Sequence, residues 1–371
     1  MKKKKLFRLA ELFCGPGGLA MGALLSTIKA KDVEYGIIPV WANDIDPWTC
    51  KTYLRNIHSG DESAVACGPI EKINLKAIPD FDALAFGFPC NDFSIVGEQR
   101  GFDGKYGPLY SYGVKAIDLN NPKWFIAENV GGLRSANNGA AFKKILQDLE
   151  NAGEGYTLTP HFYKFEEYNV PQLRHRIVIV GIKKDLGLEF KVPAPVTASK
   201  YISVKEAFEN PPIPMDASNN EQTRQSESVI ERLKHIPPGG NAWYEGIPVH
   251  LRLKVKSARM SQIYKRLHPN RPAYTITGSG GGGTHMYHWK ENRALTNRER
   301  ARIQTFPDSF VFEGSKESVR KQIGMAVPPN GAKIILEAVL KTFAGVKYPY
   351  VDANCKQFLV QTDDCLQMVL I

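Results

Sequence analysis

The sequence predicts an α/β protein whose mostly parallel sheet carries helices on both faces. Two observations lead to this class. Short apolar runs alternate with helical patterns through the first half of the chain, which is typical of strand–helix–strand units. A glycine-rich turn directly follows the first apolar run, as in folds that bind a cofactor beyond the carboxyl ends of parallel strands. The 371 residues suffice for one large domain and a smaller one.

The expected elements appear in the order that such a sheet requires. Apolar runs predict strands at 6–13, 37–44, 81–88, 123–130 and 176–182. Helical spacing of apolar residues predicts helices at 17–30, 47–57 and 138–153, and again at 296–306 and 330–345. Because ligands bind at the carboxyl ends of parallel strands, we expect the residues that follow these strands to form the site.

The composition changes after Gly181. From 183 to 270 the chain is rich in proline, serine, asparagine and basic residues, and the segment 252–266 holds six Lys or Arg and no acid. We therefore predict a catalytic and cofactor-binding domain at 1–182, a small separate domain at 183–270, and a return to the catalytic domain at 271–371.

The net charge of +10 favours a polyanionic partner, with nucleic acid as the first candidate and a merely basic protein as the alternative. Six cysteines without zinc-type spacing indicate reduced thiols. Arg8 and Glu11 interrupt the apolar segment that a signal peptide needs, and no run approaches the roughly 20 apolar residues of a membrane span. We therefore expect a cytoplasmic protein.

The stretch FGFPCNDFS, residues 86–94, places Cys90 behind a proline just after a predicted strand. Such a cysteine either fills the core or serves as a nucleophile that a loop presents to a substrate. A hydrolase based on this thiol would need a histidine base, and the loop contains none. Glycines in the following VGEQRGFDGKYGP predict a loop that closes over a substrate.

Three further groups of candidate site residues lie next to the predicted strands. Gly15 lies in the glycine-rich turn CGPGG, and Asp44 ends the second strand, where an acid often binds a ribose. Glu128 ends KWFIAENV, where a carboxyl group in apolar surroundings can donate a proton. Arg174 and Arg176 are two residues apart, and therefore on one face of an extended segment. Each group also has a structural alternative: a tight turn, a helix cap or a salt-bridged strand end.

His285 and His288, in HMYH, have a spacing that can suggest a metal site. Two histidines without further nearby ligands rarely bind a metal, and the neighbouring glycines predict a turn. We therefore expect no metal.

In their order, these motifs resemble those of the cytosine-C5 DNA methyltransferases. The series comprises the glycine turn, the strand-end acid, PCNDFS, ENV, QLRHR, the basic segment, RALTNRERARIQTFPDSF and GMAVPP, and it extends from Phe7 to Phe343. The resemblance implies a Rossmann-like S-adenosylmethionine-dependent methyltransferase fold, with 183–270 as a target-recognition domain. It also implies double-stranded DNA as the substrate and S-adenosyl-L-methionine as the cofactor.

The family pattern also implies roles for individual residues. Cys90 matches the nucleophile, and Glu128 matches the acid that contacts the N3 and amino edge of cytosine. Arg174 and Arg176 match the arginines of the Gln-x-Arg-x-Arg motif, one of which holds the cytosine O2. The residues that match the cofactor pocket, with Asp44 as the acid that binds the ribose, are Phe13, Gly15, Gly17, Gly18, Asp44, Ile45, Pro89 and Val327.

The chain departs from the family pattern at three positions. Asn91 replaces the usual glutamine after Pro-Cys and remains an amide. Pro69 stands where an aspartate often meets the cofactor adenine, and Met325 replaces the asparagine of the late Gly-Asn-x-Val motif. The last two departures concern the cofactor contacts and leave the chemistry at Cys90 intact.

The chemistry explains why these residue types occur together. Cytosine C5 is a poor nucleophile until a thiolate adds at C6, which turns the ring into an enamine that attacks a methyl cation equivalent. The target base must leave the base stack, at a cost of a few kcal/mol. Lys and Arg at 252–266 would supply phosphate contacts that position the duplex.

We therefore expect a DNA (cytosine-5-)-methyltransferase of the bacterial restriction–modification type. We expect a monomer on DNA, with a cognate restriction endonuclease in the same system that need not bind it. Two alternatives stay open. A catalytically inactive DNA-binding regulator is favoured by Pro69 and Met325 and opposed by the intact catalytic motifs. An RNA cytosine-C5 methyltransferase is opposed by the absence of the Cys-Phe-Thr and Pro-Pro-Cys signatures.

Overall fold

The computed structural model describes residues 3–88, 109–254, 260–278 and 284–359. The chain forms two compact units. The first comprises Met1–Lys164, His175–Ala194 and Ala332–Ile371, and the second comprises Phe165–Arg174 and Pro195–Gly331. The small domain expected at 183–270 therefore lies mostly in the second unit, which extends further to Gly331. The functions assigned to these parts stay predictions.

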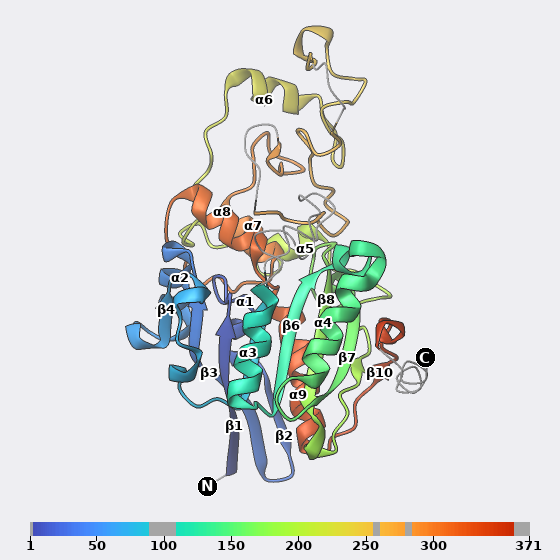
Figure 1. Ribbon diagram of the computed structural model, residues 1–371. Helices are drawn as coiled ribbons and strands as arrows, with labels where there is room; N and C mark the ends of the chain where they lie inside the picture. Colours follow the sequence, from blue (N-terminus) through green and yellow to red (C-terminus); the bar gives the residue numbers. More distant parts are fainter. Residues whose placement is uncertain (1–2, 89–108, 255–259, 279–283, 360–371) are drawn as a thin grey trace. The chain divides into compact units, whose positions relative to one another are not determined.

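A mixed sheet runs through the first unit, and in the described part of the chain it has eight strands. Their order is β2-β3-β1-β5-β6-β8-β7, with β4 paired to β3 (Figure 1). The strands are β1 (Lys3–Leu12), β2 (Thr27–Ala30), β3 (Val33–Asp44), β4 (Val65–Cys67), β5 (Ala83–Gly87), β6 (Trp124–Val130), β7 (Tyr156–Lys164) and β8 (His175–Lys183). β3, β1, β5 and β6 are parallel to one another, whereas β2 and β8 are antiparallel to their neighbours. A short pair, β9 (Val192–Pro193) and β10 (Tyr350–Val351), lies apart from this sheet.

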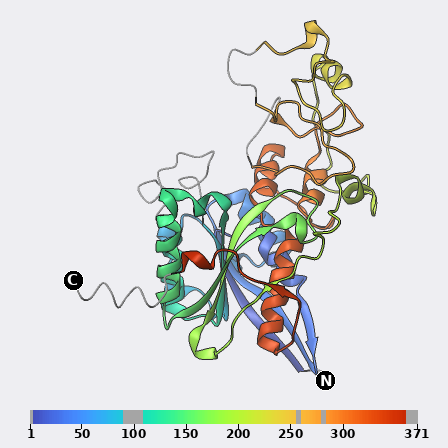
Figure 2. The ribbon, with the colours of Figure 1, turned by 90° about the vertical axis from the view of Figure 1, so that its right-hand side faces the viewer.

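Helices cover both faces of this sheet. They are α1 (Gly18–Leu24), α2 (Pro47–Ile57), α3 (Tyr110–Asn120), α4 (Ala140–Asn151) and most of α9 (Pro329–Ala344). Figure 2 shows the sheet nearly edge-on, with α4 on one side and α9 on the other. The expectation of a mostly parallel sheet between two helical layers is therefore confirmed.

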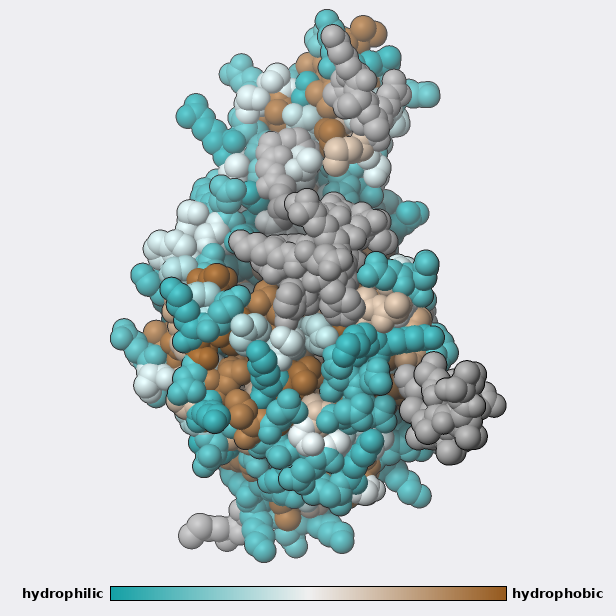
Figure 3. Space-filling view, viewed as in Figure 1, coloured by the Kyte–Doolittle hydropathy of each residue, from teal (hydrophilic) through white to brown (hydrophobic). Residues whose placement is uncertain are grey.

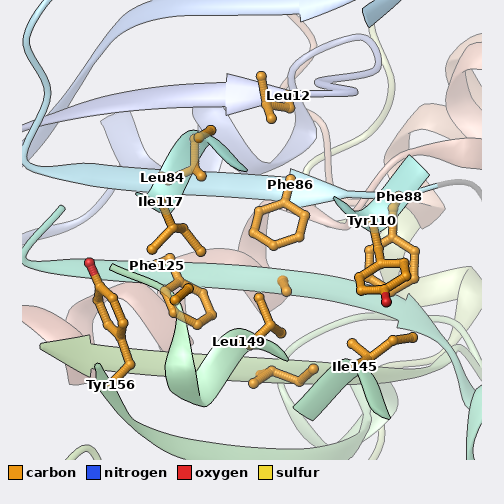
Figure 4. Packing of buried hydrophobic residues seen from close by; sticks show 14 of the residues in the cluster. Leu12, Leu84, Phe86, Phe88, Tyr110, Ile117, Phe125, Ile145, Leu149 and Tyr156 are labelled. Carbon is orange, nitrogen blue, oxygen red and sulfur yellow. The ribbon is translucent and has the colours of Figure 1, made fainter. Parts of the chain in front are cut away.

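Aromatic and branched side chains fill the space beneath α3 and α4. Leu84 and Phe86 of β5 and Phe125 of β6 point to this side, where Ile117 of α3 and Ile145 of α4 pack against them (Figure 4). All five side chains are buried. Burial of each contributes about 1.5–3 kcal/mol, so apolar packing holds both helices on the sheet.

The opposite face of the sheet is covered by α9. Side chains alternate along a strand, so Phe7 of β1 and Trp124 of β6 point to this face. The ring centroids of Phe7 and Phe343 of α9 are 4.8 Å apart, and those of Phe7 and Trp124 are 6.2 Å apart. Near the start of α9, the Ser26 hydroxyl donates to the carbonyl oxygen of Lys333 at 3.3 Å. Contacts at both ends thus fix α9 to the sheet.

The helices α8 (Lys316–Met325) and α9 follow one another along Lys316–Ala344. In the described part of the chain, this is the one helical stretch long and apolar enough to cross a membrane by length and composition. Of its most apolar window, 67% is buried inside the protein. The apolar surface of α9 contacts the sheet, as the packing of Phe343 against Phe7 of β1 shows.

The helix expected at 17–30 is shorter in the structure. α1 ends at Leu24, and Thr27–Ala30 forms β2, which pairs antiparallel with β3. The β-branched Thr27 and Ile28 favour a strand, and Lys31 takes a positive φ of 53° in the turn that reverses the chain. The expectation of one continuous helix was wrong because a short hairpin continues the same run of apolar residues.

The sequence analysis did not anticipate α3 and β7. In β7, apolar and polar residues alternate less clearly than in the other strands, and Pro160 makes a strand less expected there. β8 was expected as a strand, but it runs antiparallel to both β6 and β7. Strand direction follows from the connections between strands, which a local residue pattern does not encode.

The second unit has little regular structure apart from four short helices in its described residues. These are α5 (Val204–Glu209), α6 (Glu227–Lys234), α7 (Asn297–Ile303) and α8. α7 begins at a capping box, in which the side chains of Thr296 and Glu299 each accept a hydrogen bond from the other residue's backbone N–H. A small core beneath α6 consists of Leu233, Ile236, Ile247, Leu251, Tyr287 and Ala294.

The surface of the first unit over α3 and α4 is mostly hydrophilic, with smaller groups of hydrophobic side chains between (Figure 3). Leu119 of α3 is one of the exposed hydrophobic residues. Such a mixture is usual for a folded protein surface, so this face gives no separate indication of function.

Candidate active site

The carboxyl ends of β1, β3, β5 and β6 meet along one edge of the sheet. Leu12 of β1 pairs with Asn43 of β3 and with Phe86 of β5, and Gly87 pairs with Glu128 of β6. The residues that end or directly follow these strands therefore form a row, which is where the sequence placed the site.

The turn after β1 requires backbone conformations that favour glycine. Phe13, Gly15 and Gly17 have positive φ angles of 54°, 57° and 95°. Gly17 is the N-cap of α1, and Gly18 is its first residue. The turn leaves backbone rather than side chains at the sheet edge, which allows a ligand to approach closely.

Replacing Gly17 with alanine should destabilise the protein and weaken cofactor binding. The new Cβ would lie 3.0 Å from Cδ2 of Tyr53 and 3.1 Å from Cγ1 of Ile57, in addition to the strain of a φ of 95°. The matched control is Gly60→Ala, since Gly60 has the same φ and no heavy atom within 4 Å. Chemical denaturation should show a loss of about 1–2 kcal/mol for the control and a larger loss for Gly17→Ala. Equal losses would show that the contact with α2 is unimportant.

The two acids of NDIDP have different roles. Oδ1 of Asp46 accepts hydrogen bonds from the backbone nitrogens of Trp48 and Thr49 at 3.0 Å, so Asp46 caps α2. Oδ2 of Asp44 accepts one from the backbone nitrogen of Gly15, also at 3.0 Å. Burial raises the pKa of Asp44, and hydrogen bonds from backbone N–H groups partly offset this effect. The structure thus joins two of the predicted cofactor residues, Asp44 and Gly15.

An exposed apolar side chain lies beside this acid. Ile45 is 66% exposed. The preceding Asn43 donates from Nδ2 to the carbonyl oxygens of Ala66 at 2.7 Å and Gly68 at 3.0 Å, which ties the turn before Pro69 to β3. An acid next to an exposed apolar group is a chemically suitable pairing for a ribose and the flat face of an adenine.

Glu11, which lies in β1 just before the glycine turn, was not predicted as a site residue. Glu11 is 2% exposed, and neither carboxylate oxygen has a hydrogen-bond partner among the described residues. Burial raises its pKa to about 8, although Tyr53 lies close enough to lower it somewhat. A buried carboxyl group that has Tyr53 nearby but makes no hydrogen bond within the described residues, at the edge where a ligand is expected, is suited to receive a cationic group. The sequence does contain an indication of this role, because Glu11 is an acid within the otherwise mostly apolar run that predicts the first strand.

The protonation of Glu11 should make the stability of the ligand-free protein depend on pH. The folded state keeps the proton up to about pH 8, whereas the unfolded chain releases it near 4.5, so stability falls as the pH rises through this window. Glu11→Gln removes this dependence, so the variant should gain stability over the wild type from pH 5 to pH 8. Urea denaturation of both proteins across this range measures the difference. Parallel stability curves would contradict the raised pKa.

Glu128 and Arg176 form an ion pair across neighbouring strands. Nε of Arg176 lies 2.9 Å from Oε1 of Glu128, and the two side chains are 15% and 14% exposed. Nη1 of Arg176 also donates to the carbonyl oxygen of His175 at 2.8 Å. A Cβ on Gly87 would approach Oε2 of Glu128 to 3.2 Å, so this glycine leaves room for the carboxylate. The structure thus brings two of the predicted catalytic residues together.

The predicted residues Pro89 and Cys90 lie outside the described residues. The chain is described up to Phe88, which is buried, and its carbonyl oxygen accepts a hydrogen bond from Nδ2 of Asn129 at 3.2 Å. Asn129, which the sequence analysis did not single out, therefore ties the chain just before Pro89 to β6 beside Glu128. A buried polar residue within a predicted apolar strand was the signal for this role.

Arg174 and Arg176 have different partners. Arg174 is 1% exposed, and its Nη1 and Nη2 donate to the carbonyl oxygens of Ile276, Gly324 and Ala326 at 2.9–3.1 Å. Arg174 precedes β8, so the alternation that would place both arginines on one face does not apply to it. Its guanidinium group donates to carbonyl oxygens of the second unit, whereas Arg176 lies beside Glu128. The contact with a substrate that is expected of one of the two arginines stays a prediction.

The remaining predicted residues belong to the second unit. Val327 is partly buried there, and Met325 is 64% exposed at the end of α8. His285 and His288 also lie in this unit. Among the described residues, no group of three or more His, Cys, Asp or Glu is placed to bind a metal ion.

The basic segment 252–266 is only partly available for phosphate contacts. Arg266 is 4% exposed and donates to the carbonyl oxygens of Leu233 and His288, among others, so it supports the fold. Arg252 donates to the carbonyl oxygens of nearby loop residues. Residues 255–259 lie outside the described residues. The expected phosphate contact is therefore corrected for Arg266, whose donors are already used.

Known proteins are similar to this chain in sequence and in fold. Residues 7–341 match the family model of the C-5 cytosine-specific DNA methylases. The chain is 60% identical to the type II methyltransferase M.BbvI of Brevibacillus brevis over 357 residues, which cover 94% of each chain. It is 41% identical to the type II methyltransferase M.NgoFVII of Neisseria gonorrhoeae, over 94% of this chain and 90% of that one.

The solved structures show the same fold at lower identity. A prophage-encoded protein of E. coli, described as a putative DNA modification methyltransferase, superimposes with a TM-score of 0.65 at 22% identity, over 91% of this chain and 99% of that one. The Entamoeba histolytica methyltransferase EhMeth gives a TM-score of 0.59 at 16% identity, over 91% and 98% of the two chains. The family match along most of the chain and the relatives at 60% and 41% identity show that the chain belongs to the C-5 cytosine-specific DNA methylase family.

Proposed function

We propose that this protein transfers a methyl group from S-adenosyl-L-methionine to C5 of a cytosine within a specific duplex DNA sequence, through a covalent bond between Cys90 and C6. The observation that carries the proposal is the Glu128–Arg176 pair, which lies at the edge of the sheet directly beside the strand that leads to Cys90. The family match and the type II methyltransferase relatives support the same activity.

The residues of the pair have complementary chemistry toward a cytosine. The carboxyl group of Glu128 is suited to the N3 and amino edge, where it offsets charge as C6 is attacked, and such positioned acid–base help contributes about 10²–10⁴-fold. The guanidinium of Arg176 donates only, which suits the carbonyl oxygen O2. The pair in the ligand-free protein would then open, because each partner takes an edge of the base.

The bond changes balance around Cys90. Its thiolate adds to C6, which places electron density on C5, and C5 accepts the methyl group. A base then removes the C5 proton, the C5–C6 double bond forms again, and the Cys90 thiolate leaves. The cofactor supplies an activated methyl group. Asn129 holds the chain through the carbonyl oxygen of Phe88, which is two residues before the proposed nucleophile in the sequence.

The sheet edge also suits the cofactor. The buried Glu11 without partners fits the ammonium group of S-adenosylmethionine, and Asp44 fits the ribose hydroxyl groups. Ile45 offers an apolar surface to the adenine, and the glycine turn lets the methionine portion approach the backbone. We assign Phe13, Gly15, Gly17, Gly18, Pro89 and Val327 to the same pocket on the family pattern.

We assign the recognition of DNA to the segment 183–270 and its surroundings in the second unit. Arg174 positions this unit's residues through its contacts with backbone carbonyl oxygens rather than touching the base. We further propose a cytoplasmic monomer that protects DNA beside a cognate restriction endonuclease. The relatives do not favour an inactive regulator or an RNA methyltransferase.

Bisulfite sequencing of DNA from cells that express the gene tests the activity and identifies the target sequence. We expect one short sequence to resist conversion at a defined cytosine throughout the genome. Expression of Cys90→Ala in the same strain is the control. Full conversion in cells that contain the soluble wild-type protein would contradict the proposal.

A further inference from the structure

Among the described residues of the second unit, most arginines with little exposed surface either donate hydrogen bonds to backbone carbonyl oxygens or pair with a carboxylate. Arg298 donates to the carbonyl oxygens of Ser218, Pro307 and Phe310 at 2.6–3.1 Å. Arg293 pairs with the carboxylate of Glu299 through two hydrogen bonds of 2.7 and 2.8 Å. The buried Arg298 and the partly buried Arg293 therefore have structural roles.

Arg300 differs from these residues. It is 4% exposed, and its Nη1 donates to the carbonyl oxygen of Leu295 at 2.6 Å. The one hydrogen bond recorded for Nη2 among the described residues is a long one of 3.5 Å to Nδ1 of His285. Burial lowers the pKa of Arg300 to about 10, and the charge of Arg320 lowers it further, whereas the nearby Glu299 is already paired with Arg293. Arg300 is thus a buried cation whose second donor group is poorly satisfied.

Arg320, on α8, adds a second positive charge at the same place. Its side chain is 16% exposed, and its Nε has no hydrogen-bond partner among the described residues. Its Nη2 lies 3.8 Å from a carboxylate oxygen of Glu317, a side chain that is 85% exposed and therefore compensates the charge weakly. α8 is held firmly here, since a Cβ on Gly324 would lie 2.2 Å from the backbone of Thr277.

His285 completes the cluster as a neutral hydrogen-bond donor. Burial lowers its pKa to about 4, and the charges of Arg300 and Arg320 act in the same direction. A guanidinium group can only donate, so Nδ1 of His285 is the acceptor and its Nε2 carries the hydrogen. Arg300 and His285 thus lie 3.5 Å apart, and the charge of Arg320 acts on both of them. The acids recorded near these residues, Glu299 and Glu317, are already paired with Arg293 and Arg320.

We propose that Arg300, Arg320 and His285, the cation cluster, bind one backbone phosphate of the DNA duplex. A single phosphate brings the negative charge and the acceptor oxygens that this cluster lacks, and guanidinium groups match its geometry. The net charge of +10 agrees with a polyanionic partner. The inference rests on the proposed function for the identity of the polyanion. A contact of this kind holds the duplex in place and reads no base.

Arg320→Gln tests the cluster while leaving the more buried Arg300 in place. Loss of one charge-assisted contact should weaken DNA binding about tenfold, equally for duplexes with and without the target sequence. The slope of log affinity against log salt should fall by about 0.9, the value for one phosphate. Fluorescence anisotropy of labelled duplexes between 50 and 200 mM salt gives both quantities. The affinity for S-adenosylmethionine, measured without DNA, should stay unchanged.

The matched control is Lys316→Gln, which removes one positive charge from the same helix, at a residue whose Nζ donates to the carbonyl oxygen of Gln222. This variant should keep the wild-type salt slope to within half a unit. A salt slope for Arg320→Gln equal to that of the wild type would overturn the inference.

A measurement on the unmodified protein guards against misfolding of the variant. A bound phosphate should raise the pKa of His285, because it offsets the two arginine charges, and NMR titration of the imidazole with and without duplex follows this change. An unchanged titration of His285 in the complex would overturn the inference. Neither measurement depends on catalysis, so a protein that binds DNA through this cluster without methylating it would contradict the proposed function alone.

Discussion

Replacing Cys90 with serine should lower methyl transfer by about 10⁴-fold or more. The serine hydroxyl stays protonated near neutral pH and adds poorly to C6, whereas a thiol supplies a few per cent of the much stronger thiolate nucleophile. Without addition at C6, C5 does not become nucleophilic enough to accept the methyl group. Transfer of labelled methyl from S-adenosylmethionine to a duplex containing the target sequence measures this loss.

A duplex with 5-fluorocytosine at the target position separates the covalent step from binding. The fluorine cannot leave as a proton does, so the wild-type protein should remain attached through Cys90 after methyl transfer, which peptide mass spectrometry can locate. Cys67→Ser, which alters an exposed thiol outside the proposed mechanism, should still be trapped. Cys90→Ser should bind DNA and cofactor without being trapped. A trapped Cys90→Ser variant, or an untrapped wild type, would refute the proposed bond.

Glu128→Gln should reduce turnover about 10²–10⁴-fold while the affinity for duplex DNA changes little. Glutamine keeps the size of the side chain but cannot carry the negative charge or move a proton at the cytosine edge. It also leaves Arg176 without its ion-pair partner at 2.9 Å. Single-turnover kinetics with saturating DNA and cofactor measure the chemical step.

The control for the lost charge is Glu150→Gln on α4. Glu150 is paired with Lys184 at 3.4 Å, just after the end of the antiparallel β8 and therefore at the opposite edge of the sheet from Glu128, and this variant should keep wild-type turnover. Arg176→Gln and the double variant complete a thermodynamic cycle. Since both residues hold one base, the two single losses should sum to more than the loss in the double variant. Strict additivity, or wild-type turnover of Glu128→Gln, would show that the pair does not act on the base together.

The sequence predicted those parts of the site that depend on local patterns. Asp44 ends an apolar run that predicted a strand, and the structure places its Oδ2 3.0 Å from the backbone nitrogen of Gly15, as expected for one strand end beside another. Glu128 was predicted for the same reason. In both cases, parallel strands bring their carboxyl ends to one edge, so the end of each apolar run was enough to locate the residue.

Local patterns failed where a residue's role depends on distant contacts. The two arginines of QLRHR look equivalent in sequence, yet Arg174 contacts carbonyl oxygens more than 100 residues away, whereas Arg176 contacts Glu128. Glu11 was considered only as an interruption of an apolar segment, because its lack of a partner becomes visible only when its neighbours in space are known. The short β2 was mistaken for a helical turn because its strand partner lies further along the chain.

The sequence by itself determined the class of fold, the strand ends that carry the candidate residues and, through the order of its motifs, the family. The fold class and the strand ends depend on residues that are near one another in the chain, where hydrophobic period and turn chemistry act directly, and the family depends on the order in which such local motifs follow one another. The tertiary structure alone decided that β8 runs antiparallel, that Glu128 and Arg176 meet, and that Arg300 lies beside His285, where the charge of Arg320 acts on both. These features are set by burial and by contacts between segments far apart in the chain, and both exist only once the chain has folded.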